Sequence, residues 1–362
     1  MTRLPKKSLR ILIKAVLLFV IFNYVFSLVP DSALWRVSLF NTVLPGKTRF
    51  IPENNLDVLF NVHEIANSPR QANAYKVVLL GDSSTWGVLL NPGETSASII
   101  NASGMTTCKG QTVHVYNLGY PVPAVLKDAL LLQRALSYKP NLIIWNVTLL
   151  SVFETQAFVD SNIFLQNNAN AARNIINKYK LATRVRAPGR PTLQNQTFLA
   201  RRDDIARFIR YQLDGIRWQA TGGERVNKAY TPHGMDVKAT SLFEMRDLPP
   251  PTLDPARLRF DILNAGIRMA GNIPVVIINE PIQVVNGKNS AIRYNTMYPR
   301  WVYDQYRDLM TMKSVQYHWN YIDLWNAIPP TLFSDSPLHR TLPGEKMVSS
   351  TVKEIILKNA CP

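Results

Sequence analysis

Between residues 76 and 358, short apolar runs rich in β-formers alternate with stretches that carry apolar residues at helical spacing. The expected strands are 76–80 (KVVLL), 112–117 (TVHVYN), 142–149 (LIIWNVTL), 274–279 (PVVIIN) and 320–324, and the expected helices are 95–102, 124–137, 257–270 and 344–358. Strands that alternate with helices predict a parallel sheet covered by helices. The sequence therefore predicts an α/β layered fold over this part of the chain.

The alternation is interrupted between about 155 and 255. This stretch holds a Pro- and Arg-rich segment at 184–191, three prolines at 249–251 and, between them, a predicted helix over 198–218. One stripe of that helix is apolar, formed by Ile205, Phe208, Ile209, Leu213 and Ile216. Arginines occupy much of the rest, so the helix fits either a basic amphipathic helix on anionic lipid or a helix packed on its own domain with a solvated charged face. We favour the packed helix and expect the insertion to form a cap.

An apolar run from 11 to about 29 precedes the domain, broken only by Lys14, Asn23 and Ser27. Its length is near the roughly 20 residues that span a hydrocarbon core as a helix. Basic residues before it place the N-terminus in the cytoplasm and the rest of the chain outside the plasma membrane. We expect a single-pass anchor, with a cleaved signal peptide as the alternative. The predicted organisation is tail and anchor over 1–30, a juxtamembrane segment over 31–75, and one domain over 76–362 that contains the insertion.

The formal net charge is +16, and residues 171–230 contain thirteen Lys and Arg but only four Asp and Glu. Such an excess suggests nucleic acid or an anionic membrane as partner. The chain carries no zinc-finger spacing and no RNA-binding or basic-zipper pattern, so we expect the membrane and no nucleic acid.

The chain has two cysteines, Cys108 and Cys361, whose spacing builds no metal site. We therefore expect no metal. In an exported domain two cysteines can form a disulfide. Cys108 lies just before the second expected strand and Cys361 closes the last helix, and these places can be neighbours in a doubly wound sheet. The pair is therefore a disulfide candidate.

The sharpest chemical signal is Gly81-Asp82-Ser83-Ser84, directly after the first expected strand. A serine at the carboxyl end of a parallel strand lies where open α/β sheets bind ligands, and backbone N–H groups of such a turn can point at an oxyanion. Ser83 could also simply cap the helix that follows it. Because two further segments, described next, fit the same chemistry, we favour Ser83 as a nucleophile.

These segments resemble the SGNH/GDSL hydrolase family. The family's first block is a G-D-S after the first strand, its second matches 117–120 (NLGY), and its last matches 333–339 (FSDSPLH) followed by Gly344. The resemblance implies a flavodoxin-like three-layer sandwich and a catalytic set of Ser83, Asp335 and His339. It also implies an oxyanion hole formed by the N–H groups of Ser83 and Gly119, and no cofactor.

The sequence departs from the family pattern twice. The family's Asp-to-His interval is three residues, whereas Asp335 and His339 are four apart. The family's third block brings an asparagine after the third strand, and that position falls here on Leu150, which cannot donate a hydrogen bond. Asn146 or Thr148, earlier on the same strand, could supply the third oxyanion donor.

The function that these residues imply is acyl transfer from an ester to water. We expect a serine esterase that acts on O-acyl groups of a cell-envelope glycan or lipid. The two alternatives are an O-acyltransferase that modifies an exported polysaccharide and a catalytically inactive member of the fold that binds an envelope polymer or a protein. The sequence identifies no protein partner.

Overall fold

A computed structural model describes residues 6–29, 47–50, 54–67, 74–186, 192, 194–221, 234 and 250–361. The chain divides into two compact units. The first comprises Met1–Pro45 and Pro188–Gly223, and the second comprises Gly46–Ala187 and Glu224–Pro362.

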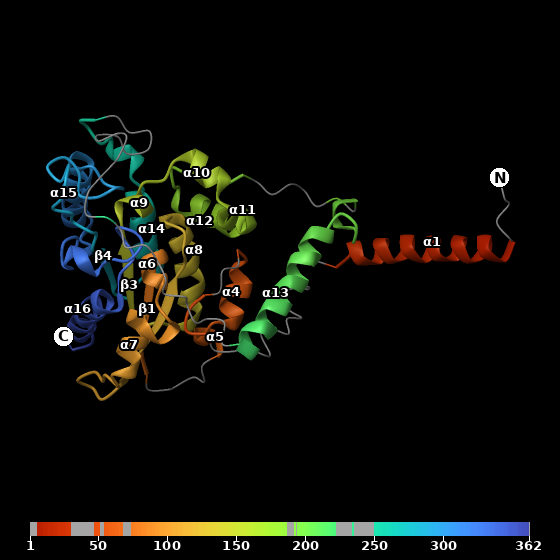
Figure 1. Ribbon diagram of the computed structural model, residues 1–362, viewed down its shortest axis with the longest axis horizontal. Helices are drawn as coiled ribbons and strands as arrows, with labels where there is room; N and C mark the ends of the chain where they lie inside the picture. The colour runs from red at the N-terminus through yellow and green to blue at the C-terminus, as the bar shows by residue number, and fades with distance from the viewer. Residues whose placement is uncertain are drawn as a thin grey trace. The chain divides into compact units, whose positions relative to one another are not determined.

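The second unit is built on one parallel sheet of five strands (Figure 1). The strands are β1 (Ala74–Gly81), β2 (Thr112–Gly119), β3 (Leu142–Val147), β4 (Val275–Asn279) and β5 (Asn320–Asp323). Their order across the sheet is β2-β1-β3-β4-β5, and every neighbouring pair is parallel. This order places the switch point beside β1, between β1 and β3, as in flavodoxin-like sheets. The predicted fold class is confirmed.

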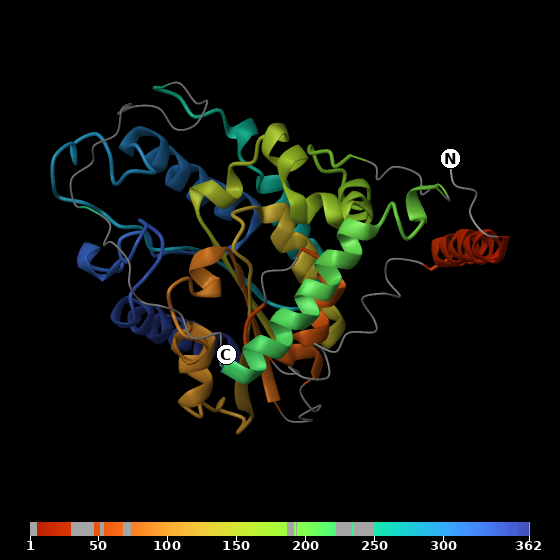
Figure 2. The same cartoon turned by 45° about the vertical axis from the view of Figure 1, so that its right-hand side comes forward.

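The central strands are apolar on both sides because helices cover both faces of the sheet. Val77, Leu79, Ile144 and Val276 belong to one core cluster, which α7 (Ser96–Ala102) and α16 (Leu342–Ala360) close from their side. On the other face lie α8 (Val125–Ala135) and α14 (Phe260–Ala270), and Gly266 of α14 packs directly on the ring of Trp145. Figure 2 shows the helices on either side of the strands.

Several further helices complete this unit. The sequence did not predict the long helix α15 (Arg300–Tyr317), which precedes β5. The shorter ones are α4 (Leu56–Val62), α5 (Glu64–Asn67), α6 (Ser83–Trp86), α9 (Leu149–Val152), α10 (Gln156–Ser161), α11 (Ile163–Asn167) and α12 (Ala169–Tyr179).

Part of the predicted juxtamembrane segment is built into the sheet unit. Arg49 Nη1 donates to the carbonyls of Gly87 and Leu90 at 3.1 and 2.9 Å, and Trp86 Nε1 donates to the carbonyl of Phe50. Phe50 itself is buried. Arg49 and Phe50 therefore pack at the loop after α6, whereas Phe60 stacks on Tyr138 and His63 contacts the Asn117 carbonyl of β2.

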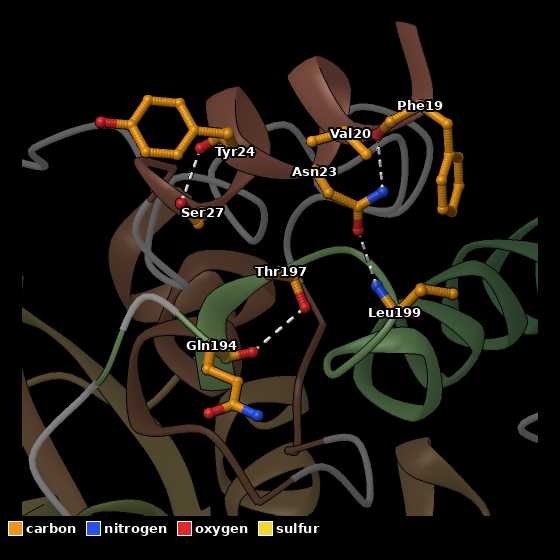
Figure 3. Close-up of a pocket in the computed structure, with 8 residues that line it drawn as sticks. All are labelled: Phe19, Val20, Asn23, Tyr24, Ser27, Gln194, Thr197 and Leu199. Atoms are coloured by element: carbon orange, nitrogen blue, oxygen red, sulfur yellow. Dashed lines mark hydrogen bonds between the residues drawn. The ribbon is translucent and has the colours of Figure 1, made fainter. Parts of the chain in front are cut away.

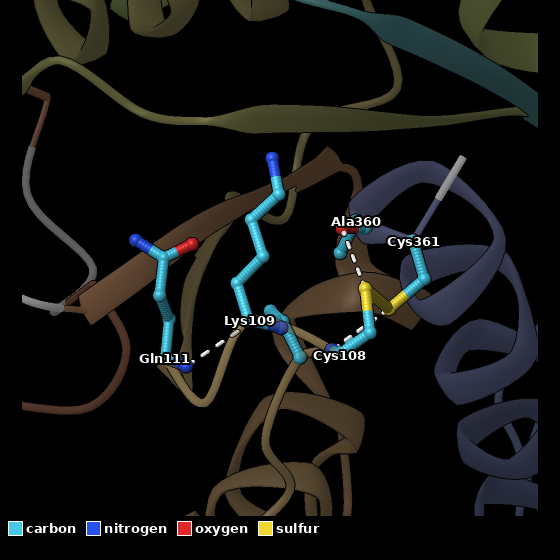
Figure 4. Close-up of a disulfide and its surroundings, with 6 residues drawn as sticks. Cys108, Lys109, Gln111, Ala360 and Cys361 are labelled. Atoms are coloured by element: carbon cyan, nitrogen blue, oxygen red, sulfur yellow. Dashed lines mark hydrogen bonds between the residues drawn. A yellow bond between two sulfur atoms is a disulfide. The ribbon is translucent and has the colours of Figure 1, made fainter.

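Cys108 and Cys361 form a disulfide, and their Cα atoms are 5.6 Å apart (Figure 4). Cys108 lies between α7 and β2, and Cys361 directly follows α16. Because α7 and α16 pack on the same face of the sheet, the two cysteines meet at the ends of neighbouring elements.

The first unit contains α1 (Lys6–Ser27) and α13 (Arg202–Thr221). An 18-residue window within Lys7–Ser27 has a mean hydropathy of 2.1, and within the described part of the chain α1 is the one helix long and apolar enough to cross a membrane. The predicted insertion is divided, since Ala187 and the residues before it belong to the sheet unit and Pro188–Gly223 belongs with α1. That the insertion caps the site stays a prediction.

Candidate active site

Ser83 is the first residue of α6, directly beyond the carboxyl end of β1. Asp82 is the N-cap of this helix, and its Oδ1 accepts a hydrogen bond from the Ser84 amide at 3.0 Å. The capping role that competed for Ser83 is therefore filled by Asp82. Gly87 ends the helix in the left-handed conformation at φ 89°, which glycine adopts without strain. These features hold the Ser83 hydroxyl, which is half-buried, at the sheet edge.

Asp335, His339 and Ser83 form a hydrogen-bonded relay. His339 Nε2 lies 2.9 Å from Ser83 Oγ, and His339 Nδ1 lies 2.8 Å from Asp335 Oδ1. A carboxylate can only accept, so Nδ1 carries a proton and Nε2 is free to accept from the serine hydroxyl. The structure thus brings together all three residues that the sequence nominated, in the arrangement of nucleophile, base and orienting acid.

The four-residue interval between Asp335 and His339 is accommodated by a compact loop. Phe333 and Arg340 pair across its base, and the Ser334 amide donates to the His339 carbonyl at 2.8 Å. Inside the loop, Ser336 Oγ accepts from the amides of Leu338 and His339 at 3.2 and 3.1 Å. The extra residue is thereby absorbed in the turn, and the carboxylate still reaches the imidazole.

The predicted oxyanion role of Gly119 is not supported. Its N–H donates to Asn117 Oδ1 at 3.0 Å, so the hydrogen is already used within the protein. The glycine is required for a different reason, because a Cβ at this position would collide with the Trp86 nitrogen and the Thr85 backbone. Asn117 Nδ2 donates to the Thr85 carbonyl at 2.9 Å. The end of β2 therefore packs against the backbone of the turn that carries Ser83.

Of the two side-chain alternatives for the third donor, Asn146 keeps one amide hydrogen and stays a predicted donor, because its Nδ2 donates a single hydrogen bond, to Thr85 Oγ1 at 2.9 Å. Thr148 is fully buried and caps α9, where its Oγ1 accepts from the Ser151 amide. Leu150 lies within α9. The Ser83 N–H and the second amide hydrogen of Asn146 remain as the predicted donors.

The sequence reasoning missed a buried charge network that joins the nucleophile's turn to the histidine loop. Arg340 is buried and donates from Nη1 to Glu280 Oε1 at 3.2 Å, from Nη2 to the Ser84 carbonyl at 3.1 Å, and from Nε to Glu345 Oε2 at 2.6 Å. The Ser84 hydroxyl donates to Glu280 Oε2. Every polar group of this arginine thus contacts the active-site framework or the start of α16.

Glu280 directly follows β4, so its carboxylate sits at the same sheet edge as Ser83. Burial raises the pKa of Glu280 to about 7, while Arg340 acts in the opposite direction. The only sequence signal was a charged residue at the end of an apolar strand, which does not reveal a partner 60 residues away.

A second buried cation lies behind the turn. Lys127 of α8 donates from Nζ to the carbonyls of Gly81 and Tyr120 at 2.7 and 3.2 Å, and pairs with Asp128 at 2.5 Å. Gly81 and Tyr120 lie at the ends of β1 and β2, so Lys127 fixes both strand ends. A charged pair in the first turn of an otherwise apolar helix was the signal available in the sequence.

Groups that could bind a metal do not gather near this site. Within the described residues, no cluster of three or more His, Cys, Asp or Glu side chains could hold a metal ion.

His63 has a structural role. It is fully buried, and its Nδ1 accepts a hydrogen bond from the Ile65 amide. Burial lowers the pKa of His63 to about 3, so it stays neutral.

Searches of known proteins gave little to compare. No protein-family model and no curated protein matches the chain. Among solved structures, a lipase/acylhydrolase from Enterococcus faecalis matches with a TM-score of 0.36 and 16% identity over 78% of this chain and 95% of its own. A gut microbial diltiazem-metabolizing enzyme matches with the same TM-score and 12% identity over 78% of this chain and 46% of its own. Scores of this size carry no argument about activity, so function rests on the site's own geometry.

Proposed function

We propose that this chain is a serine hydrolase of the SGNH/GDSL kind that cleaves ester bonds of O-acyl groups. The observation that carries the proposal is the 2.9 Å separation of Ser83 Oγ and His339 Nε2, with Asp335 on the other imidazole nitrogen. Separation beyond hydrogen-bond reach would instead favour the inactive, binding form of the fold. Ser83 is half-buried at the end of β1, so it is not sealed inside the core.

In the proposed reaction, His339 Nε2 takes the hydroxyl proton as Ser83 Oγ attacks the ester carbonyl carbon. The resulting imidazolium is stabilised by Asp335, which also keeps the Nδ1–H tautomer in place. When the tetrahedral intermediate collapses, the imidazolium returns its proton to the leaving alcohol and an acyl-serine remains. Water, deprotonated by the same nitrogen, then releases the acid. The Ser83 N–H is the proposed oxyanion donor, and one such donor contributes about 3 kcal/mol to transition-state stabilisation in other hydrolases.

We further propose that α1 anchors the enzyme and that the sheet unit acts outside the plasma membrane. Five basic residues and no acidic ones lie among the first fourteen positions, which supports an inside N-terminus. An acylated glycan or lipid of the cell envelope is then the accessible substrate class. Mass spectrometry of the N-terminal peptide from the mature protein tests the anchor, since a cleaved signal peptide would remove residues 11–29.

The catalytic proposal is tested on the full chain in detergent with a fluorophosphonate probe and with p-nitrophenyl acetate. Labelling and turnover should be lost in Ser83→Ala and in His339→Gln. The matched control is His114→Gln, because His114 lies on β2 and contacts Glu64 instead of Ser83. Undiminished labelling in Ser83→Ala would refute the proposed nucleophile. Labelling without ester turnover in the parent protein would favour the acyltransferase alternative.

A further inference from the structure

Helix α13 leaves part of its apolar stripe exposed. Ile209, Leu213 and Ile216 are 51%, 60% and 46% exposed, and Leu199 just before the helix is 51% exposed. Gln212 and Gly215 are buried, and Ile205 and Phe208, at the same edge of the stripe, are half-buried. Within its own unit, α13 therefore leaves Ile209, Leu213 and Ile216 uncovered. That its stripe packs on the rest of the domain stays a prediction.

Charged residues flank this stripe. Arg210 and Arg217 each directly follow a stripe residue, about 100° further around the helix, and both are exposed. Asp214 likewise directly follows the stripe residue Leu213, and Asp203 and Asp204 lie in the first turn of the helix. Arginines beside an exposed apolar stripe are what an interfacial helix presents to anionic lipid.

The start of α13 is tied to the end of α1. The ring of Phe198 contacts those of Phe22 and Phe26, each at 5.4 Å between centroids. The Leu199 amide donates to Asn23 Oδ1 at 3.3 Å, as Figure 3 shows. Arg201 Nη1 donates to the Val29 carbonyl at 2.7 Å, just past the last turn of α1.

These contacts fix where α13 begins relative to the bilayer. If α1 spans the membrane, its last turn reaches the outer interface, and residues 198–201 are held at that level. A pocket of about 370 Å³ lies beside them, lined chiefly by apolar groups of Phe19, Val20, Tyr24 and Leu199 (Figure 3). If α1 spans the membrane, this apolar pocket lies against lipid. The exposed stripe of α13 would be covered in the same apolar environment.

We infer that α13 lies on the outer surface of the membrane. Its stripe of Leu199, Ile209, Leu213 and Ile216 enters the boundary between headgroups and chains, and Arg210 and Arg217 contact anionic headgroups. The inference concerns a second membrane contact, so it rests on the proposed anchor and is independent of the proposed chemistry.

The test places an environment-sensitive NBD fluorophore on single introduced cysteines of the full chain in nanodiscs. Leu213→Cys reports the stripe, and Asp204→Cys is the matched control on the far side of the same helix. Labelling is done without reductant so that the Cys108–Cys361 disulfide stays closed. Each protein is placed in phosphatidylcholine alone and in phosphatidylcholine with about 30% phosphatidylglycerol. Ester hydrolysis on the same samples separates this test from that of the catalytic proposal.

With anionic lipid, we expect the probe at 213 to shift its emission to the blue and to lose about half its intensity to nitroxide-labelled lipid. The probe at 204 should instead remain open to iodide. In Arg210→Gln with Arg217→Gln, the dependence on phosphatidylglycerol should weaken. Equal iodide quenching at both positions would overturn the inference. Protection of position 213 from iodide and from nitroxide lipid alike would also overturn it, because a protein surface would then cover the stripe.

Discussion

Arg340 Nη1 lies 3.2 Å from Glu280 Oε1, and Arg340 is the residue directly after His339. The same guanidinium holds the Ser84 carbonyl, next to the nucleophile. The distance between nucleophile and base is therefore set by one buried side chain that touches neither of them. Such a residue acts by positioning, and small displacements of a catalytic pair are costly to rate.

Arg340→Lys should lower kcat by roughly 10-fold or more while KM changes little. Lysine keeps the charge but cannot bridge Glu280, Glu345 and the Ser84 carbonyl at once. The measurement is steady-state hydrolysis of p-nitrophenyl acetate, with circular dichroism to verify folding. Arg307→Lys is the control, since Arg307 forms a comparable pair with Asp323 at 2.8 Å outside this network. An unchanged kcat in a folded Arg340→Lys protein would contradict the positioning role.

Gly119→Ala should impair the site although the added group is a single methyl. Its Cβ would meet the Trp86 nitrogen and the Thr85 backbone, so the Ser83 turn must move. We expect a loss of about 1–3 kcal/mol in unfolding free energy, as for other overpacked sites, and slower phosphonate labelling. Gly93→Ala provides the comparison, because a Cβ there meets nothing within 4 Å. Equal labelling rates for the two variants would contradict this account of Gly119.

Glu154 makes stability depend on pH. Burial raises its pKa from 4.5 to about 7, with the Leu126 amide and Arg259 acting against that shift. A raised pKa means that the folded state binds the proton more tightly than the unfolded state. The corresponding stabilisation is complete below about pH 4.5 and is lost as the pH rises to about 7, a change on the order of 3 kcal/mol.

Glu154→Gln should therefore reduce the pH dependence of Tm between pH 5 and 8, leaving the part that comes from Glu280, and it should raise Tm most at the alkaline end. Thermal melts of the full chain in detergent measure this. Glu354→Gln, at an exposed position of α16, should leave the slope as it is. A wild-type slope in Glu154→Gln would mean that Glu154 is not the titrating group.

The disulfide should contribute about 2–5 kcal/mol to the free energy of unfolding, because it restrains a long stretch of the unfolded chain. The two cysteines are 253 residues apart in sequence. A reductant should lower the Tm of the parent, whereas Cys108→Ser with Cys361→Ser should start lower and not respond. A reductant-sensitive double variant would show that the effect does not come from this bond.

The sequence by itself determined the scaffold. Periodicity and chain composition are local, so the five strands, most of the flanking helices and the position of Ser83 at the end of β1 could be predicted from neighbouring residues. The loop that carries Asp335 and His339 was also found, since its residues lie together in the chain.

Only the tertiary structure decided which groups are engaged. Gly119 was expected to stabilise an oxyanion, yet its N–H is used by Asn117, and nothing in the local pattern distinguishes a free amide from a used one. Glu280 meets a hydroxyl 196 residues earlier in the chain. The exposed stripe of α13 has the same cause, because a helix's apolar side is visible in sequence, whereas the surface it faces is fixed by long-range packing.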